Sequence, residues 1–146
     1  MITVQYTINK EKVLEEVART SSYVGKTAVA DGSAYEQVFT TDADRDLLDR
    51  YWREACGVVA EMLKPVVNSV WHGPDYVVIV RLPSAYNQEF TGIINSDLFS
   101  FVVNTILSKW FMMTAKEEAA TYATLAEGAL NDAKAKVYFK KKPTRD

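Results

Sequence analysis

Hydrophobic residues recur at intervals of three and four in the middle of the chain, and this period predicts an amphipathic helix. The helix is expected to begin at an N-cap supplied by Thr41 or Asp42 and to end near Pro65. Its apolar stripe consists of Leu47, Leu48, Tyr51, Trp52, Ala55, Val58, Val59, Met62 and Leu63. Charged residues lie off this stripe, so one side of the helix is expected to pack on a core.

Apolar and polar residues alternate at the N-terminus, which predicts that residues 1–8 form a short strand or an extended arm. A helix is expected from about Lys10, with Asn9 as its N-cap and Gly25 as its end. Residues 26–40 contain the turn signal Asp-Gly-Ser and are predicted to form a loop.

The period changes after the central helix, and the new pattern predicts a β-hairpin. Tyr76–Leu82 is rich in β-branched and aromatic residues, which favour a strand. A turn of sequence His-Gly-Pro-Asp precedes it at residues 72–75. The partner strand is expected at Val66–Trp71, although the sequence leaves open that this segment extends the preceding helix.

A long helix is predicted from about Glu89 to Met113, and apolar residues cover it nearly all round. A helix with so little polar surface is buried on several sides. It is therefore either the central helix of the domain or one that a neighbouring subunit covers. Its most apolar stretch, Leu98–Met113, is shorter than the roughly 20 residues of a membrane span, so no membrane contact is expected.

The last predicted helix runs to about Tyr138 and is rich in alanine, which stabilises helices. Thr114 and Glu117 have the spacing of a capping box, in which two side chains satisfy backbone amides reciprocally. Small side chains along this helix let a partner helix come close. Residues 139–146 are predicted to form a basic tail.

These elements together predict a mainly α fold: a compact bundle of about four helices with a small β-hairpin and an extended N-terminal arm. The length of 146 residues suits a single domain. Hydrophobic residues make up 48% of the chain and charged residues 25%, which is typical of a globular protein. A net charge of −2 does not favour binding to nucleic acid or to an anionic membrane. No secretory signal is recognisable, so a cytoplasmic location is expected.

Residues suited to catalysis or metal binding are sparse. Cys56 and His72 are the only residues of their kinds, which excludes a disulfide framework and metal sites built on paired histidines. Cys56 falls on the core side of its helix and is expected to be buried. Residues 25–27, Gly-Lys-Thr, match the end of a phosphate-binding loop, but threonine stands at position 20, where that motif needs glycine. We expect no enzyme activity, cofactor or metal, with a small carboxylate-dependent enzyme as a lesser alternative.

Large side chains with no evident core role are candidates for contacts with other molecules. Trp71 is expected to be exposed at the hairpin, whereas Trp52 and Trp110 fall on core stripes. Tyr122 and Leu125 are the candidate interface residues of the alanine-rich helix. The basic tail is either a solvated helix end or a contact to nucleic acid or an acidic partner. Its candidate contact residues are Lys140, Lys141, Lys142 and Arg145.

The second half of the chain resembles a known protein class. The run Leu82-Pro83-Ser84 leads into a long helix that ends in Leu107-Ser108-Lys109-Trp110-Phe111. After it come Thr114, Glu117-Glu118-Ala119 and Tyr122, then an alanine-rich helix and a basic end with Pro143. Together with the helix around residues 47–53, this order resembles small neck and head–tail connector proteins of tailed bacteriophages and prophages.

The resemblance implies a structural protein of the virion rather than an enzyme. Proteins of this class pack side by side in a ring at the portal vertex and bridge the portal to the tail. The expected partners are therefore further copies of the chain and other virion proteins, and the basic tail would allow non-specific proximity to DNA. The expected location is the bacterial cytoplasm and then the virion. The alternatives are a tail-completion protein and a non-catalytic helical interaction module.

Overall fold

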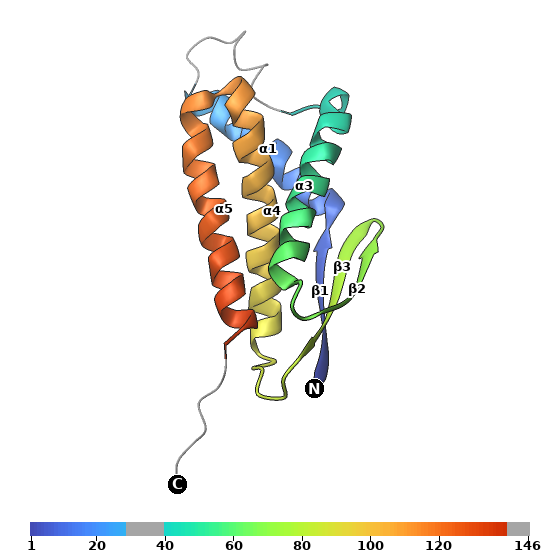
Figure 1. Ribbon diagram of the computed structural model, residues 1–146. Helices are drawn as coiled ribbons and strands as arrows, with labels where there is room; N and C mark the ends of the chain where they lie inside the picture. Colours follow the sequence, from blue (N-terminus) through green and yellow to red (C-terminus); the bar gives the residue numbers. More distant parts are fainter. Residues whose placement is uncertain (29–39, 140–146) are drawn as a thin grey trace.

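The computed structural model describes residues 1–28 and 40–139, and the fold is mainly α (Figure 1). The described residues form four α-helices, one short 3-10 helix and three strands. In chain order these are β1 (Ile2–Asn9), α1 (Lys10–Ala28), the 3-10 helix η1 (Asp42–Asp44), α3 (Arg45–Leu63), β2 (Val67–His72), β3 (Asp75–Leu82), α4 (Phe90–Thr114) and α5 (Lys116–Val137). The expected helical bundle with a small hairpin is confirmed.

The N-terminal segment is a strand of the sheet rather than a separate arm. The sheet is antiparallel in the order β1-β3-β2, so the first strand of the chain lies beside the last. Val4, Tyr6 and Ile8 are buried, because alternate side chains point to the face that the helices cover. The Tyr6 hydroxyl also donates a hydrogen bond to the Tyr86 hydroxyl at 3.1 Å, which ties β1 to the segment before α4.

The start of α1 agrees with the sequence, but its end does not. The backbone amide of Lys12 donates to Oδ1 of Asn9 at 2.8 Å, which is the expected N-cap contact. The helix then continues through Gly25 to Ala28, so the predicted stop is wrong. Val24 and Gly25 are both buried, and tertiary packing outweighs the roughly 1 kcal/mol that glycine costs in a helix. The Gly-Lys-Thr tripeptide is therefore helical, and no phosphate-binding loop forms there.

The almost wholly apolar helix α4 is the central helix of the chain, which decides between the two alternatives drawn from its sequence. It contacts α1, α3, α5 and β1, and Figure 1 shows it between α5 on one side and the sheet on the other. Its buried side chains are Ile94, Leu98, Phe101, Val102, Val103, Ile106, Leu107, Trp110 and Phe111. With 25 residues it is longer than the apolar stretch marked in the sequence, and its length and composition match those of a membrane-crossing helix.

Helix α5 packs along α4 through its alanines. Ala119, Ala126 and Ala133 are buried and lie seven residues apart, so they fall on one face of the helix. At one end of this seam the rings of Phe111 and Tyr122 lie 5.1 Å apart. The alanine spacing thus explains why two long helices pair closely within one chain.

The capping box predicted at the start of α5 is wrong. Thr114 belongs to α4, and its hydroxyl donates to the carbonyl of Trp110 at 3.1 Å. A threonine at the end of a helix can bond back to the carbonyl four residues earlier, and here that bond removes the capping hydroxyl. Ala115 is the N-cap of α5 and has no side-chain capping bond.

Candidate functional site

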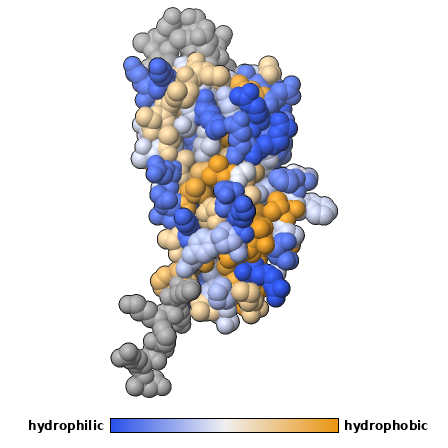
Figure 2. All heavy atoms as spheres, in the orientation of Figure 1, coloured by the Kyte–Doolittle hydropathy of each residue, from blue (hydrophilic) through white to orange (hydrophobic). Residues whose placement is uncertain are grey.

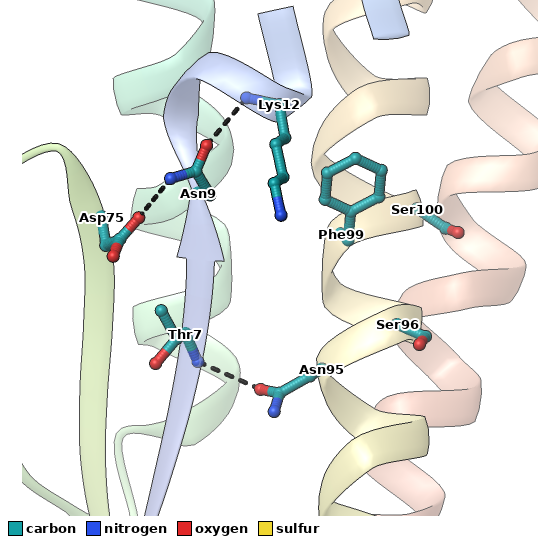
Figure 3. Close-up of a pocket in the computed structure, with 8 residues that line it drawn as sticks. All are labelled: Thr7, Asn9, Lys12, Asp75, Asn95, Ser96, Phe99 and Ser100. Carbon is teal, nitrogen blue, oxygen red and sulfur yellow. Dashed lines mark hydrogen bonds between the residues drawn. The ribbon is translucent and has the colours of Figure 1, made fainter.

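An open polar groove lies between β1 and α4 (Figure 3). Its volume is about 520 Å³. The groove is lined by Thr7, Asn9, Lys12, Asp75, Asn95, Ser96, Phe99 and Ser100. Strand β1 and the first turn of α1 form one wall, and successive turns of α4 form the other.

Two hydrogen bonds fix the positions of the polar residues in this groove. Oδ1 of Asn95 accepts the backbone amide of Thr7 at 3.0 Å, which joins α4 to the outer edge of β1. Nδ2 of Asn9 donates to Oδ1 of Asp75 at 2.7 Å, which joins the end of β1 to the start of β3. Much of the polar lining therefore satisfies the protein's own backbone and turns.

The remaining groups of the groove suit hydrogen bonding more than catalysis. Figure 3 shows the Lys12 side chain directed between β1 and α4, with the Phe99 ring opposite and with Ser96 and Ser100 pointing away from β1. The groove contains one carboxylate, that of Asp75, which already accepts a hydrogen bond. Nothing in this lining pairs a nucleophile with a base. Across the described part of the chain, no three His, Cys, Asp or Glu residues are grouped so that they could hold a metal ion.

A second hollow of about 460 Å³ lies between α3 and the hairpin turn. It is lined by Lys10, Trp52, Arg53, His72 and Gly73. Nζ of Lys10 lies 2.9 Å from Oδ1 of Asp49, so that ammonium group is shared with a carboxylate. The centroids of the His72 and Tyr76 rings lie 4.9 Å apart, so the histidine packs beside a tyrosine of β3.

The single cysteine lies in the core, as its sequence position predicted. Cys56 has 1% of its surface exposed, and burial raises the pKa of its thiol from 9.0 to about 12. The thiolate is the reactive form of cysteine, so the raised pKa leaves this residue a poor nucleophile. Trp52 and Trp110 are likewise buried, as expected.

The candidate interface residues differ in exposure. Trp71 is 70% exposed and Leu125 is 51% exposed, so both are accessible for contacts. Tyr122 is half-buried against Phe111, and burial raises the pKa of its phenol. The structure thus separates Tyr122, which packs within its own chain, from Leu125 on the same helix. The basic tail residues Lys140, Lys141, Lys142 and Arg145 lie outside the described residues, as does the Asp-Gly-Ser turn signal.

Sequence reasoning missed several exposed apolar side chains. On β2 these are Val67 and Val70, beside Trp71. At the end of α4 they are Met112 and Met113, each 57% exposed. Figure 2 shows hydrophobic side chains over α4 between α5 and α3, and again where α3 approaches the sheet. The signal in the sequence was weak, because a valine in a predicted strand is usually assigned to the core.

Comparison of the chain with protein-family models, with curated proteins and with solved structures finds no match. The resemblance to connector proteins therefore stays a prediction.

Proposed function

We propose that this protein is a virion assembly component of the head–tail connector or neck type, which packs into a ring of identical copies and has no catalytic activity. The observation that carries this proposal is the placement of exposed apolar side chains on two elements that flank α4. Trp71 lies on β2 and Leu125 on α5, and Figure 1 shows these elements on opposite sides of the central helix.

Two different patches on opposite sides of a molecule suit a ring. In a head-to-tail ring, one patch of each copy meets the other patch of the next copy, so the two patches must differ. A self-complementary dimer would need only one patch. The sheet patch is the face of β2 that carries the Trp71 indole, and the α5 patch is a helix surface with an exposed leucine, so the two differ in shape.

The proposed partners are other copies of the chain and the virion proteins above and below the ring. In this scheme the basic residues near the C-terminus would lie near DNA or near an acidic partner surface; these are Lys140, Lys141, Lys142 and Arg145. A contact to DNA through so few charges would be non-specific and sensitive to salt. The proposed location is the bacterial cytoplasm during assembly and the virion afterwards.

The direct test is the solution mass of the protein, measured by light scattering over a range of protein and salt concentrations. A defined assembly many times the 16.4 kDa monomer is the expected result. The variants Trp71→Arg and Leu125→Arg should each abolish it and leave a folded monomer. The control Glu15→Arg, on the exposed side of α1, should assemble like the unaltered protein. A strict monomer at every concentration would contradict self-assembly.

The second candidate function is a helical interaction module that binds a different protein. The open edge of β2 favours it, because that edge can serve one partner without any ring. A monomer that binds a partner through this edge is the result that would favour this candidate over the connector.

A further inference from the structure

The hydrogen bonds around β3 show which backbone groups of β2 face away from the sheet. The amide of Arg81 donates to the carbonyl of Val66 at 2.8 Å, and the amide of Gly73 donates to the carbonyl of Asp75 at 3.1 Å. In an antiparallel pair, the N–H and C=O of one residue point to the same side, and successive residues alternate. The odd-numbered residues of β3 therefore face β2.

The register then assigns residues 69–72 of β2. Ser69 pairs with Ile79 and Trp71 pairs with Val77, so the backbone groups of Ser69 and Trp71 point to β3. Those of Val70 and His72 point the other way, to the outer side of β2. No described strand pairs with that side, since β2 is the last strand of the sheet.

The two edges of the sheet differ in whether another element of the chain covers them. At the β1 edge, the outward amide of Thr7 is bound by Asn95 of α4, so a helix covers that edge. At the β2 edge the side chains are exposed along the whole strand, including Val67, Val70 and Trp71. Proteins commonly cover or charge their edge strands, and an open apolar edge is a template for pairing with another chain.

An arginine lies beside this edge on the helix side of the sheet. Arg53 of α3 and His72 of β2 line the same hollow, and within the described part of the chain Arg53 makes no ion pair. Lys10 also lines the hollow, but its ammonium group is paired with Asp49. None of the five residues that line the hollow is acidic. An arginine without a carboxylate partner complements a carboxylate on another protein.

We propose that the β2 edge binds an extended acidic segment of a partner protein, which adds a fourth strand to the sheet. The backbone of that segment bonds to Val70 and His72, and its carboxylates on the helix side approach Arg53. Main-chain bonding supplies the attachment in this mode, and side chains supply the selectivity. The inference goes beyond ring formation, because a chain that stays monomeric can still bind such a segment.

The test uses a fluorescein-labelled synthetic peptide of eight residues in which threonine and glutamate alternate. Fluorescence anisotropy with the full chain should show saturable binding, and a matched peptide with lysine in place of glutamate should not bind. Arg53→Glu should weaken binding by about tenfold or more. The control Arg19→Glu, an exposed arginine of α1 that is already paired with Glu16, should leave the affinity unchanged.

Amide hydrogen exchange, followed by NMR, separates strand addition from simple charge attraction. The amides of Val70 and His72 should exchange much more slowly in the peptide complex, whereas those of Ser69 and Trp71 are already bonded within the sheet and should change little. Peptide binding without protection of Val70 and His72 would overturn the strand addition. Three results would contradict the proposal that the partner segment is acidic. These are equal binding of both peptides, no binding of either peptide, and preferential binding of a single-stranded DNA oligonucleotide. Protection of the same two amides without any peptide, in a sample that dimerises, would show that a second copy occupies the edge and would likewise overturn it.

Discussion

The α4–α5 pair and strand β2 both carry apolar side chains, yet those of the helix pair are largely covered by the described residues and those of β2 are exposed. Along α5, alanines seven residues apart are buried against α4, which is itself surrounded by α1, α3 and β1. Along β2, all six residues are exposed, and they include two valines and a tryptophan. Burial of apolar surface within the chain stabilises the fold, whereas apolar surface left open at a strand edge is available for association.

The difference lies in how many neighbours each element has. Helix α4 has neighbours on several sides, so most of its apolar side chains are buried. Among the described residues, strand β2 pairs with β3 alone, and all six of its residues are exposed. The same residue type, valine, therefore serves folding in β3 and is left for contacts in β2.

The largest expected loss of stability comes from truncating a buried side chain of α4. Leu98 of α4 is fully buried, and Leu98→Ala should lower the free energy of unfolding by about 2–5 kcal/mol, because it leaves a cavity. The same truncation at the exposed Leu125 should change it by less than about 0.5 kcal/mol. Urea unfolding followed by circular dichroism measures both. Equal losses of unfolding free energy at the two sites would contradict the claim that Leu98 supports the fold and Leu125 does not.

Overfilling the alanine seam should have the next largest effect. Ala133 is fully buried between α5 and α4, and Ala133→Leu should lower the free energy of unfolding by about 1–3 kcal/mol through steric strain. Ala135 is exposed on the same helix, and Ala135→Leu is the matched control with almost no expected effect. A stable Ala133→Leu variant would mean that the two helices are not closely packed.

A smaller effect is expected at the covered edge of the sheet. Asn95→Ala removes the bond to the Thr7 amide and should lower the free energy of unfolding by about 1 kcal/mol. Hydrogen exchange at Thr7 should become faster at the same time. Ser96→Ala is the control, because the Ser96 hydroxyl bonds only to Gly92 of its own helix. Unchanged exchange at Thr7 would show that Asn95 does not protect the edge.

The smallest effect on stability is expected at the open edge. Trp71→Ser should change the free energy of unfolding by less than about 0.5 kcal/mol, since the indole is 70% exposed. Trp52→Ser, at a tryptophan that is 5% exposed, should lower it by about 3–5 kcal/mol. Thermal unfolding of the two variants makes the comparison. A large loss at Trp71 would place that residue in the fold rather than at an interface.

Much of the fold follows from local patterns, and the errors have physical causes. The period of α3 and the β-branched run of β3 predicted those elements because both are set by residues close in sequence. The pairing of β1 with β3 joins residues 66 to 80 positions apart, which no local pattern specifies. The end of α1 was misplaced because tertiary packing tolerates Gly25 inside a helix.

The candidate site was less predictable than the fold. The exposure of Trp71 followed from its place at a hairpin, but the opposite roles of Tyr122 and Leu125 depend on which side of α5 meets α4. The hollow that contains Arg53 and His72 is lined by residues of α1, α3 and the β2–β3 hairpin, and their spacing in the sequence gives no sign that they meet.

The most direct test of head-to-tail assembly mixes two variants that each lack one patch. Trp71→Arg keeps the α5 patch and Leu125→Arg keeps the sheet patch, so each variant alone should be a folded monomer of 16.4 kDa. When they are mixed in equal amounts, the intact patch of one can bind the intact patch of the other, and light scattering should show a dimer and nothing larger. A mixture that stays monomeric, or a single variant that still forms the full assembly, would contradict a ring built from these two patches.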